Sequence, residues 1–524
     1  MAIIKLLKNM LLSNKPLRAV KVSKPYKTVL YDKVADSDRL DRGEISDRAK
    51  NFIDAVRLDD LTVLHSAVIV ENGVVVGEYY DEYLDSRAYH EAYSMSKTLV
   101  SLAIGVLIGE GKLRVDDKVC EILDLTSRGI KARGEYLNLT IKDLLTMKSM
   151  SSFNEFQAIP TSQDWLRDFY RAKKKKGEFD YNSLNSYVLS AVVQKISGVR
   201  LSQFLKVKVF EPLGIRRYFW EEEKGVDKGG WGLYALCEDM AKLGLLVLNK
   251  GKWRGEQLVP KSYIEEMTKA HSKAPSRLGD YDYGYHLWVH REENVLLFSG
   301  MLGQNVFIFP DKNVVVAINA GGGDIFQRYP VYDMAKRVFC DGEELKVVER
   351  EKDSGYSFEF DGEYKLAKPA RKIGILPLTR SVMANNYRTG IDKISVQVKS
   401  GKFVIQGANI PIKVGEKTRF DLSWGGEIYA CISGLEYLEG KALLVLSFPE
   451  TAVRRFFEFD IKNQKIRIYE TPILDILNSG VDMACEALGK GLKSRLLRKM
   501  YNSKFLRKRI NRLVNFETKI INIK

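Results

Sequence analysis

The chain has 524 residues, of which 45% are hydrophobic and 29% are charged. This composition is ordinary for a globular protein and excludes an intrinsically disordered chain, and the length exceeds what one hydrophobic core usually supports. The five cysteines are scattered without paired spacing, which argues against a disulfide framework and a zinc site and favours a reducing compartment. We therefore expect a cytoplasmic protein of two or three domains that holds no metal.

The net charge of +16 is concentrated at the two ends of the chain. Residues 1–28 hold seven Lys and Arg and no acidic residue, and residues 490–524 hold twelve Lys and Arg and one acidic residue. The chain between these two tails is close to neutral. Basic tails can bind an anionic membrane surface or a nucleic acid, whereas the alternative is a solvated tail that only keeps the protein soluble.

The segment 1–28 is predicted to contain a short, basic amphipathic helix. Lys5 and Lys8 interrupt its apolar residues, which is unlike the continuous apolar core of a secretory signal. No later apolar run is long enough to cross a bilayer. We expect neither export nor a membrane span, so a place at the inner face of the membrane depends on the tails alone.

Residues 29–345 alternate between strand and helix patterns in an order typical of an α+β domain. Two strands flank the turn at Asn72-Gly73, which is a strong hairpin signal. Helices are predicted over 92–113, 138–150, 185–198 and 237–251, and strands over 283–290, 294–300, 305–310 and 313–323. Thr140 is expected to cap the second helix and Gly198 to end the third. Strands from both ends of this segment would build one antiparallel sheet flanked by helices, with a helical subdomain from its middle.

Residues 346–478 alternate apolar and polar side chains, as in "KISVQVKSGKFVIQG", and predict a C-terminal all-β domain of barrel or sandwich type. Residues 479–524 are predicted to form a basic helical tail. Leu492, Leu496 and Met500 would share one face of that helix, which is the pattern of an interfacial helix, and the alternative is a helix docked on the protein's own surface. No aromatic platform accompanies the basic residues, so nucleic acid is the least favoured partner.

The stretch "AYSMSKTLVSLAIGVLIGEGKL" (92–113) places Ser94 and Lys97 at the start of an apolar helix. Positions i and i+3 share one face of a helix, so the hydroxyl and the amine can meet. Burial disfavours the charged form of an amine and lowers its pKa, so Lys97 can accept the Ser94 proton near neutral pH. Free N–H groups at the helix start lie where an acyl oxyanion would form. An S-x-x-K pair alone is common, and most such pairs lie at the surface.

The region around this pair resembles the serine β-lactamase-like hydrolases, a family that includes class C β-lactamases, D-alanyl-D-alanine carboxypeptidases, esterases and aminohexanoate-oligomer hydrolases. The resemblance rests on "LHSAVIVENGVVVGEYY", "EAYSMSKTLVSLAIGVLIGEGKL", "GEFDYNSLNSYVLSAVVQKISG" and "FSGMLGQNVFIFPDKNVVVAINA", which follow one another in the family's order. It implies the β-lactamase/transpeptidase fold for residues 29–345 and acyl-enzyme chemistry that uses no metal and no organic cofactor.

Two of the three motifs that define the family match in the residues that carry the reaction. Ser94 and Lys97 match S-x-x-K. Tyr181, in "YNS", matches the tyrosine of the Y-x-N motif, which implies an acid/base role, and its alternative is an ordinary core or surface tyrosine. Ser183 replaces the asparagine of that motif and is expected among the substrate-binding residues. This variation looks closest to the aminohexanoate-oligomer hydrolases and esterases.

The third motif departs from the family pattern of a basic residue, any residue and glycine, because the chain has Met301, Leu302 and Gly303. The missing basic residue weakens any claim to β-lactam or D-Ala-D-Ala substrates, whose carboxylates that residue helps to hold. Gly303 would let the substrate lie close to the strand, and the backbone N–H of Gln304 would be the second oxyanion donor beside that of the nucleophile. Met150 stands where the family often has glycine, and we expect only a local loop change there.

We expect a serine hydrolase of amidase, esterase or carboxypeptidase type. It would cleave a small amide, ester or peptide-like substrate through an acyl-enzyme on Ser94, with Lys97 as base and Tyr181 as acid/base. The alternative is a catalytically inactive member of the fold, retained as a binding or regulatory protein and held at a membrane by its tails. The missing basic residue and Ser183 leave this alternative open, whereas the complete set of nucleophile, lysine and tyrosine argues against it.

Overall fold

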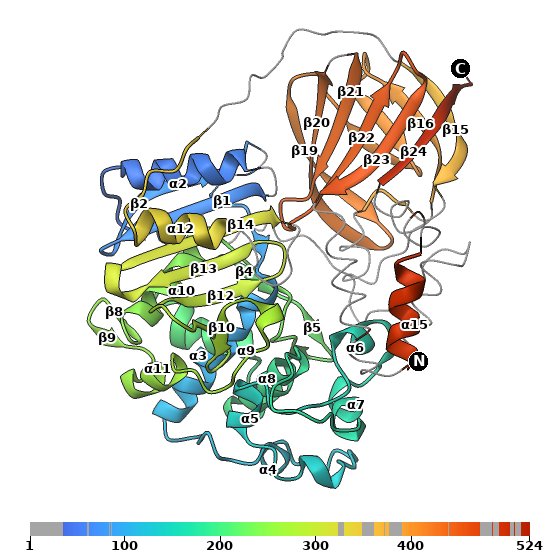
Figure 1. Ribbon diagram of the computed structural model, residues 1–524. Helices are drawn as coiled ribbons and strands as arrows, with labels where there is room; N and C mark the ends of the chain where they lie inside the picture. Colours follow the sequence, from blue (N-terminus) through green and yellow to red (C-terminus); the bar gives the residue numbers. More distant parts are fainter. Residues whose placement is uncertain are drawn as a thin grey trace.

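The computed structural model describes residues 35–59, 62–82, 84, 86–322, 330–347, 361–370, 373–376, 390–438, 440–471, 485, 492–503, 508 and 515–523. These residues fold into an α+β part and a barrel-like β part that lie side by side (Figure 1). Within the same ranges, no helix combines the length and the apolar content that crossing a membrane requires. The predicted N-terminal segment 1–28 lies outside the described residues.

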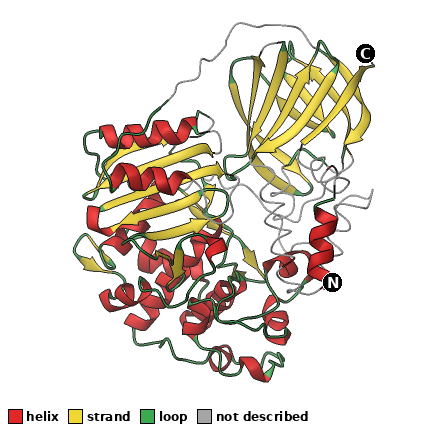
Figure 2. Cartoon of the chain, in the orientation of Figure 1, coloured by secondary structure: helices red, strands yellow, loops and turns green. Residues whose placement is uncertain are grey.

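A seven-stranded antiparallel sheet forms the centre of the α+β part, and helices cover both of its faces (Figure 2). In spatial order its strands are β10 (Tyr281–Tyr283), β11 (Trp288–His290), β12 (Leu296–Gly300), β13 (Gln304–Phe309), β14 (Val314–Gly322), β1 (Thr62–Glu71) and β2 (Val74–Tyr80). Asn72 and Gly73 join β1 to β2, and both have the positive φ that a two-residue hairpin turn requires. As predicted, β1 pairs with β14, so the two ends of the segment meet in one sheet.

The other elements of the α+β part are helices, single helical turns and short strands. The helices are α2 (Asp47–Leu58), α3 (Ser96–Gly109), α4 (Val119–Leu123), α5 (Ile141–Leu145), α6 (Glu155–Thr161), α7 (Trp165–Arg171), α8 (Leu184–Ser197), α9 (Leu201–Leu205), α10 (Cys237–Leu248), α11 (Lys261–Met267) and α12 (Pro330–Phe339), and the turns are η1 (Tyr93–Met95), η2 (Gly134–Tyr136), η3 (Lys206–Phe210), η4 (Ser276–Leu278) and η5 (Pro310–Lys312). The short strands are β3 (His90–Glu91), β4 (Tyr218–Trp220), β5 (Glu222–Glu223), β6 (Val226–Asp227), β7 (Leu233–Ala235), β8 (Lys252–Trp253) and β9 (Glu256–Gln257). α8 packs against α3, α4, α5 and α9 and organises the helical subdomain.

Alternate residues of the central strands pack against helices on opposite faces of the sheet. Ala67 and Ile69 of β1 belong to an apolar core shared with α2 and α12. Val68 and Val70 belong to a second core shared with α3 and α10. Because neighbouring residues of a strand point to opposite faces, a strand that is covered on both faces is apolar at successive positions, as β1 is from Ala67 to Val70.

Local signals explain where several helices begin and end. Thr140 caps α5, since its hydroxyl accepts a hydrogen bond from the N–H of Asp143 and the Asp143 carboxylate accepts one from the N–H of Thr140. Gly198, with a φ of +77°, ends α8 as predicted. The predicted strand over 283–290 is instead divided between β10 and β11, because His286 has a φ of +55°.

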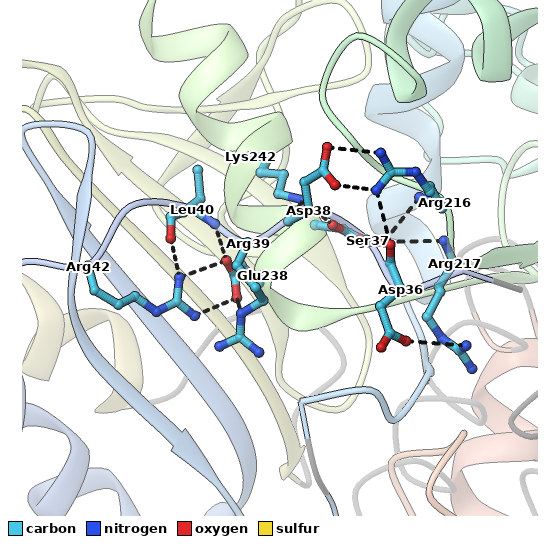
Figure 3. A network of polar contacts seen from close by, with 11 residues as sticks. Asp36, Ser37, Asp38, Arg39, Leu40, Arg42, Arg216, Arg217, Glu238 and Lys242 are labelled. Carbon is cyan, nitrogen blue, oxygen red and sulfur yellow. Dashed lines mark hydrogen bonds and ion pairs between the residues drawn. The ribbon is translucent and has the colours of Figure 1, made fainter.

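A network of polar contacts connects residues 36–42 to α10 (Figure 3). Ser37 Oγ donates to Asp239 at 2.7 Å, and Glu238 pairs with two arginines of this segment at 2.6 and 2.8 Å. Lys242, which is 1% exposed, pairs with Asp239 at 2.7 Å. Buried charges are tolerated in a fold only when they are paired, so these contacts fix the segment against α10.

The C-terminal part is a ten-stranded antiparallel sheet that curves around one apolar core (Figure 1). In spatial order its strands are β18 (Ala408–Pro411), β17 (Lys402–Ile405), β16 (Ile391–Gln397), β15 (Gly362–Ala370), β24 (Asn515–Asn522), β23 (Lys465–Thr471), β22 (Arg454–Asp460), β21 (Lys441–Ser447), β20 (Glu427–Leu438) and β19 (Lys417–Trp424). The predicted α+β fold followed by an all-β domain is confirmed. The boundary after residue 345 stays a prediction, because residues 348–360 lie outside the described ranges.

The end of the chain differs from the predicted helical tail. A helix, α15 (Leu492–Tyr501), is present, but Asn515–Asn522 form β24, which pairs with β15 and β23. Phe516, Thr518 and Ile520 alternate with exposed residues and face the interior. This period of two indicates a strand. Because the strand is short and follows many basic residues, the pattern of the whole tail favoured a helix.

Candidate active site

Ser94 lies in η1, the turn that leads directly into α3, and its side chain is half-buried. Tyr93, one residue earlier, has a φ of +45°, a left-handed conformation that is unusual for a tyrosine. Ser96 Oγ donates to the carbonyl of Tyr93 at 2.7 Å and ties the turn to the helix. Such a conformation persists only where surrounding contacts enforce it, so Ser94 stands on a fixed turn at the start of a helix.

Lys97 lies in the first turn of α3 and is 1% exposed. Its Nζ lies 2.7 Å from Ser94 Oγ and donates to the carbonyl of Gly230 at 2.7 Å. Burial lowers the pKa of Lys97 from 10.5 to about 7, and the charge of Glu155 acts in the opposite direction. A neutral amine has two N–H groups and one lone pair, so Lys97 can donate to Gly230 while it accepts the proton of Ser94.

Glycine is required at the segment that brings this carbonyl to Lys97. A Cβ on Gly230 would lie 2.5 Å from the carbonyl oxygen of Ser183, and a Cβ on Gly229 would lie 2.5 Å from that of Ser186. The chain therefore passes over the start of α8 at a distance that excludes any side chain. No motif indicates the role of Gly230 in the sequence, and the Gly229-Gly230 pair is the signal there of a close backbone approach.

Tyr181 completes the cluster of groups around the nucleophile. Its ring centroid lies 4.9 Å from Lys97 Nζ, and the neighbouring side chain of Ser94 acts to lower the pKa of its phenol. Trp288 stacks on the ring at 5.4 Å between centroids, and Tyr283 meets it edge-on at 5.9 Å. Burial raises the pKa of Tyr181, so the phenol is protonated near neutral pH and can donate a proton.

The two residues after Tyr181 contact the loop of residues 151–155. Asn182 is fully buried, and its Nδ2 donates to the carbonyl of Phe153 at 2.9 Å. Ser183 Oγ donates to Glu155 Oε1 at 2.9 Å, and its N–H donates to Oε2 at 3.2 Å. Ser183 thus lies beside the cluster with its hydroxyl engaged by Glu155, and its part in substrate binding stays a prediction. No sequence motif marks Glu155, so its place in the site was not predicted.

The third motif forms the turn between β12 and β13. Leu302 and Gly303 have φ values of +70° and +94°. The side chain of Gln304 donates from Nε2 to the carbonyls of Leu302 at 3.1 Å and Ala320 at 2.7 Å, which binds the turn to β14. That side chain is occupied in holding the turn, so an oxyanion role of Gln304 can fall only to its backbone N–H and stays a prediction.

The backbone conformation of Met150, in the loop after α5, explains why the family often has glycine at this position. It has a φ of +57°, a conformation that glycine adopts without strain, and its side chain is 5% exposed. Ser149, the preceding residue, donates to Asn185 at 2.5 Å and so joins this loop to α8. The family's preference for glycine at this position therefore reflects the backbone.

Residues 65–324 match the protein family described as Beta-lactamase. Over 299 residues the chain is 22% identical to the 6-aminohexanoate-dimer hydrolase of Paenarthrobacter ureafaciens, an alignment that covers 50% of this chain and 75% of that protein. Similar solved structures include an octameric penicillin-binding protein homologue from Pyrococcus abyssi, with 20% identity, a TM-score of 0.45 and coverage of 80% of this chain and 97% of that one. A penicillin-binding protein from Bacillus halodurans has 18% identity, a TM-score of 0.43 and coverage of 55% and 98%.

The central sheet, the helical subdomain and the matches to known hydrolases define the protein as a serine hydrolase. The predicted enzyme class is therefore confirmed. Through residues 65–324, the chain belongs to the serine β-lactamase-like hydrolase family, as the sequence motifs indicated.

Proposed function

We propose that this hydrolase cleaves a small amide or ester through an acyl-enzyme on Ser94, with Lys97 as general base and Tyr181 as general acid. The distance of 2.7 Å between Lys97 Nζ and Ser94 Oγ carries the proposal, because Lys97 is at the same time only 1% exposed. A buried amine costs free energy in the fold, and a base with a pKa near the working pH accounts for its presence.

Acylation begins when Ser94 Oγ attacks the carbonyl carbon of the substrate and its proton moves to Lys97 Nζ. The electron pair of the carbonyl moves onto oxygen, and the backbone N–H groups of Ser94 and Gln304 stabilise the resulting oxyanion. When the tetrahedral intermediate collapses, the bond to the amine or alkoxide breaks. The leaving group takes a proton from Tyr181, which recovers one from Lys97. Ser94 is then esterified by the acyl group.

Deacylation repeats these steps with water as the nucleophile. Lys97 is the base in this step: Tyr181 takes a proton from water as it passes its own proton to Lys97, while the water oxygen bonds to the acyl carbon. The ester bond to Ser94 breaks, and Oγ regains the proton. The products are a carboxylic acid and the free enzyme, and no metal or organic cofactor enters the reaction.

The name of one relative and one motif support linear amides and esters as substrates. The relative from Paenarthrobacter ureafaciens is a 6-aminohexanoate-dimer hydrolase, whose name denotes a linear amide. Met301 stands where the family has the basic residue that helps to hold a carboxylate. We therefore propose uncharged esters and linear amides in preference to β-lactams.

The test is labelling with a fluorophosphonate probe, which forms a covalent bond with an activated serine. We expect label on the native enzyme and on Ser183→Ala, a matched loss of a neighbouring hydroxyl, and no label on Ser94→Ala. Label that persists in Ser94→Ala, or that never forms on the native enzyme, would contradict the proposal. A screen of p-nitrophenyl esters, p-nitroanilides and a chromogenic β-lactam then measures the order of preference.

We separately propose that the enzyme binds an anionic membrane surface through its basic tails. In α15, Arg495, Arg498 and Lys499 are exposed, and Leu496 is 58% exposed beside them, which is the composition of an interfacial helix. Residues 1–28 and most of 479–514 lie outside the described ranges. The cytoplasmic location and the domain limits 1–28, 29–345, 346–478 and 479–524 stay predictions.

A point variant tests this membrane proposal better than truncation, because removal of residues 490–524 would also remove β24 from the barrel. We expect Leu496→Glu to sediment less with phosphatidylserine vesicles, by about fivefold, since one charge near such a surface contributes about 1 kcal/mol. Val207→Glu, at an apolar side chain that is 59% exposed on the α+β part, is the matched control. Equal sedimentation of both variants would contradict a role for α15.

A further inference from the structure

The connection between β21 and β22, residues 448–453, is buried along its whole length, and we call it the barrel loop. Ala452 is 1% exposed and Val453 is 0% exposed. Hairpin connections normally lie at the surface, because their backbone polar groups need water or a partner. A hairpin connection that is completely buried must therefore pack against another part of the molecule.

The barrel loop packs against both segments that carry the proposed oxyanion donors. Ala452 and Val453 form one apolar cluster with Tyr93 and Leu302, and Met301 packs against the cluster. Tyr93 directly precedes the proposed nucleophile, and Leu302 lies in the turn that precedes the second donor. Two residues of the β part therefore lie next to the reacting centre of the α+β part.

Polar contacts hold the barrel loop in this position. The N–H of Glu91 donates to the carbonyl of Glu450 at 2.9 Å, two residues before Ala452. Arg454, at the end of the loop, pairs with Asp81 at 3.0 Å, and these side chains are only 9% and 14% exposed. Since one contact joins β3 to the loop and the other joins the residue after β2 to the first residue of β22, the loop cannot move away from the site without breaking partly or fully buried interactions.

The side chains in the contact between the barrel loop and the segments at Tyr93 and Leu302 indicate which kind of substrate group fits beside it. Met301 stands at the position where the family has a cation, and it packs against the cluster that contains Ala452 and Val453, so the surroundings of this position are apolar. A substrate carboxylate placed there would lose water without gaining a charged partner, whereas an alkyl group would lose nothing. Val453, a β-branched residue, is 0% exposed in this contact, so its side chain leaves no open surface on that side.

We propose that the barrel loop forms a wall of the active site and limits the size of the uncharged substrate group that fits beside Ser94. This inference rests on the proposed function of Ser94. Val453 and Ala452 are then specificity-determining residues contributed by the β part. Substrates with a short alkyl group fit against this wall, and those with a long chain or a carboxylate are excluded.

The experiment compares Val453→Ala with Val445→Ala. Val445 is 4% exposed and packs with Ile432 in a separate cluster of the barrel, so this control removes the same methyl groups away from the site. We measure kcat/KM for p-nitrophenyl acetate, butyrate and octanoate, which vary the acyl group, and for methyl, butyl and octyl butyrate, which vary the leaving group. In one of the two series, Val453→Ala should raise the ratio of kcat/KM for the long substrate to kcat/KM for the short substrate about tenfold. Val445→Ala should change this ratio less than about twofold.

A second variant acts in the opposite direction and guards against misfolding. Ala452→Leu adds volume to the wall. In the same series it should lower the ratio of kcat/KM for the long substrate to that for the short substrate about tenfold. Circular dichroism and the thermal midpoint establish which variants are folded. If Val453→Ala does not fold, Ala452→Leu alone decides whether the barrel loop limits the size of the substrate.

The outcomes separate this inference from the proposed function. A fluorophosphonate that labels Ser94 in all folded variants, together with unchanged selectivity in both series, would overturn the role of the barrel loop and leave the acyl-enzyme proposal intact. A native enzyme that the probe does not label would overturn both. Selectivity that changes equally in Val453→Ala and Val445→Ala would indicate a general effect on stability. It would also overturn the proposal that the barrel loop forms a wall of the active site.

Discussion

The pKa of Lys97 sets the pH profile of the proposed reaction, because only the neutral amine can take the Ser94 proton. Burial lowers this pKa to about 7. The neutral fraction is then about one tenth at pH 6 and about nine tenths at pH 8, so kcat/KM should rise about tenfold over this interval and level off above it. An exposed lysine with an ordinary pKa would give about a hundredfold rise over the same interval and no plateau below pH 10.

The variant Glu155→Gln tests the electrostatic part of this explanation. The carboxylate of Glu155 favours the charged form of Lys97, so removal of its charge should lower the pKa of Lys97 further. The midpoint of the acid limb should therefore move to lower pH, while the oxygen of the isosteric amide can still accept from the N–H of Ser183 and its NH2 group can donate to Ser183 Oγ. Glu265→Gln, on an exposed side chain of α11, is the matched control and should leave the midpoint in place.

The assay is kcat/KM for a p-nitrophenyl ester between pH 5 and 10 at constant ionic strength. A midpoint near the ordinary lysine value would refute the burial argument. A midpoint that stays fixed or rises in Glu155→Gln would refute the assigned influence of Glu155. Because kcat/KM reports the free enzyme, the measured midpoint belongs to the enzyme before substrate binds.

Three further substitutions follow from the site and the barrel. Tyr181→Phe keeps the ring but removes the proton donor, so kcat should fall about 10²- to 10⁴-fold, and a fall below tenfold in steady-state assays would argue against the acid role. Gly230→Ala places a Cβ 2.5 Å from the carbonyl oxygen of Ser183, so the loop must shift away from the amine, and probe labelling should slow with little loss of helix by circular dichroism. Arg455→Met removes the guanidinium that pairs with the buried Glu470 carboxylate at 2.8 Å, and denaturant unfolding should show a loss of about 3–5 kcal/mol, most of which a double variant with Glu470→Leu should restore.

The sequence predicted the features that depend on neighbours in the chain. The hairpin at Asn72-Gly73, the cap at Thr140 and the glycine stop of α8 are local signals, and the structure has each of them. The same holds for Ser94 and Lys97, since one helical turn brings them together whatever the remainder of the fold does.

The features that the sequence did not predict depend on contacts between distant segments. The carbonyl of Gly230 reaches Lys97 from 133 positions away, and Glu155 lies on a short helix without any recognisable pattern. β24 was not predicted because it has only eight residues and follows a strongly basic segment, so its period of two is a weak signal. The barrel loop gave no signal, because an ordinary hairpin and one inserted beside an active site have the same local sequence features.

The position of β24 has a consequence for how the enzyme matures during translation. β24 lies between β15, the first strand of the barrel, and β23, so the barrel cannot be complete before this late segment has left the ribosome. The α+β part emerges earlier and can assemble its own sheet once α12 has been made. A nascent chain would thus acquire its reactive serine before the loop that restricts access to it, and substrate discrimination would be the last property of the enzyme to form.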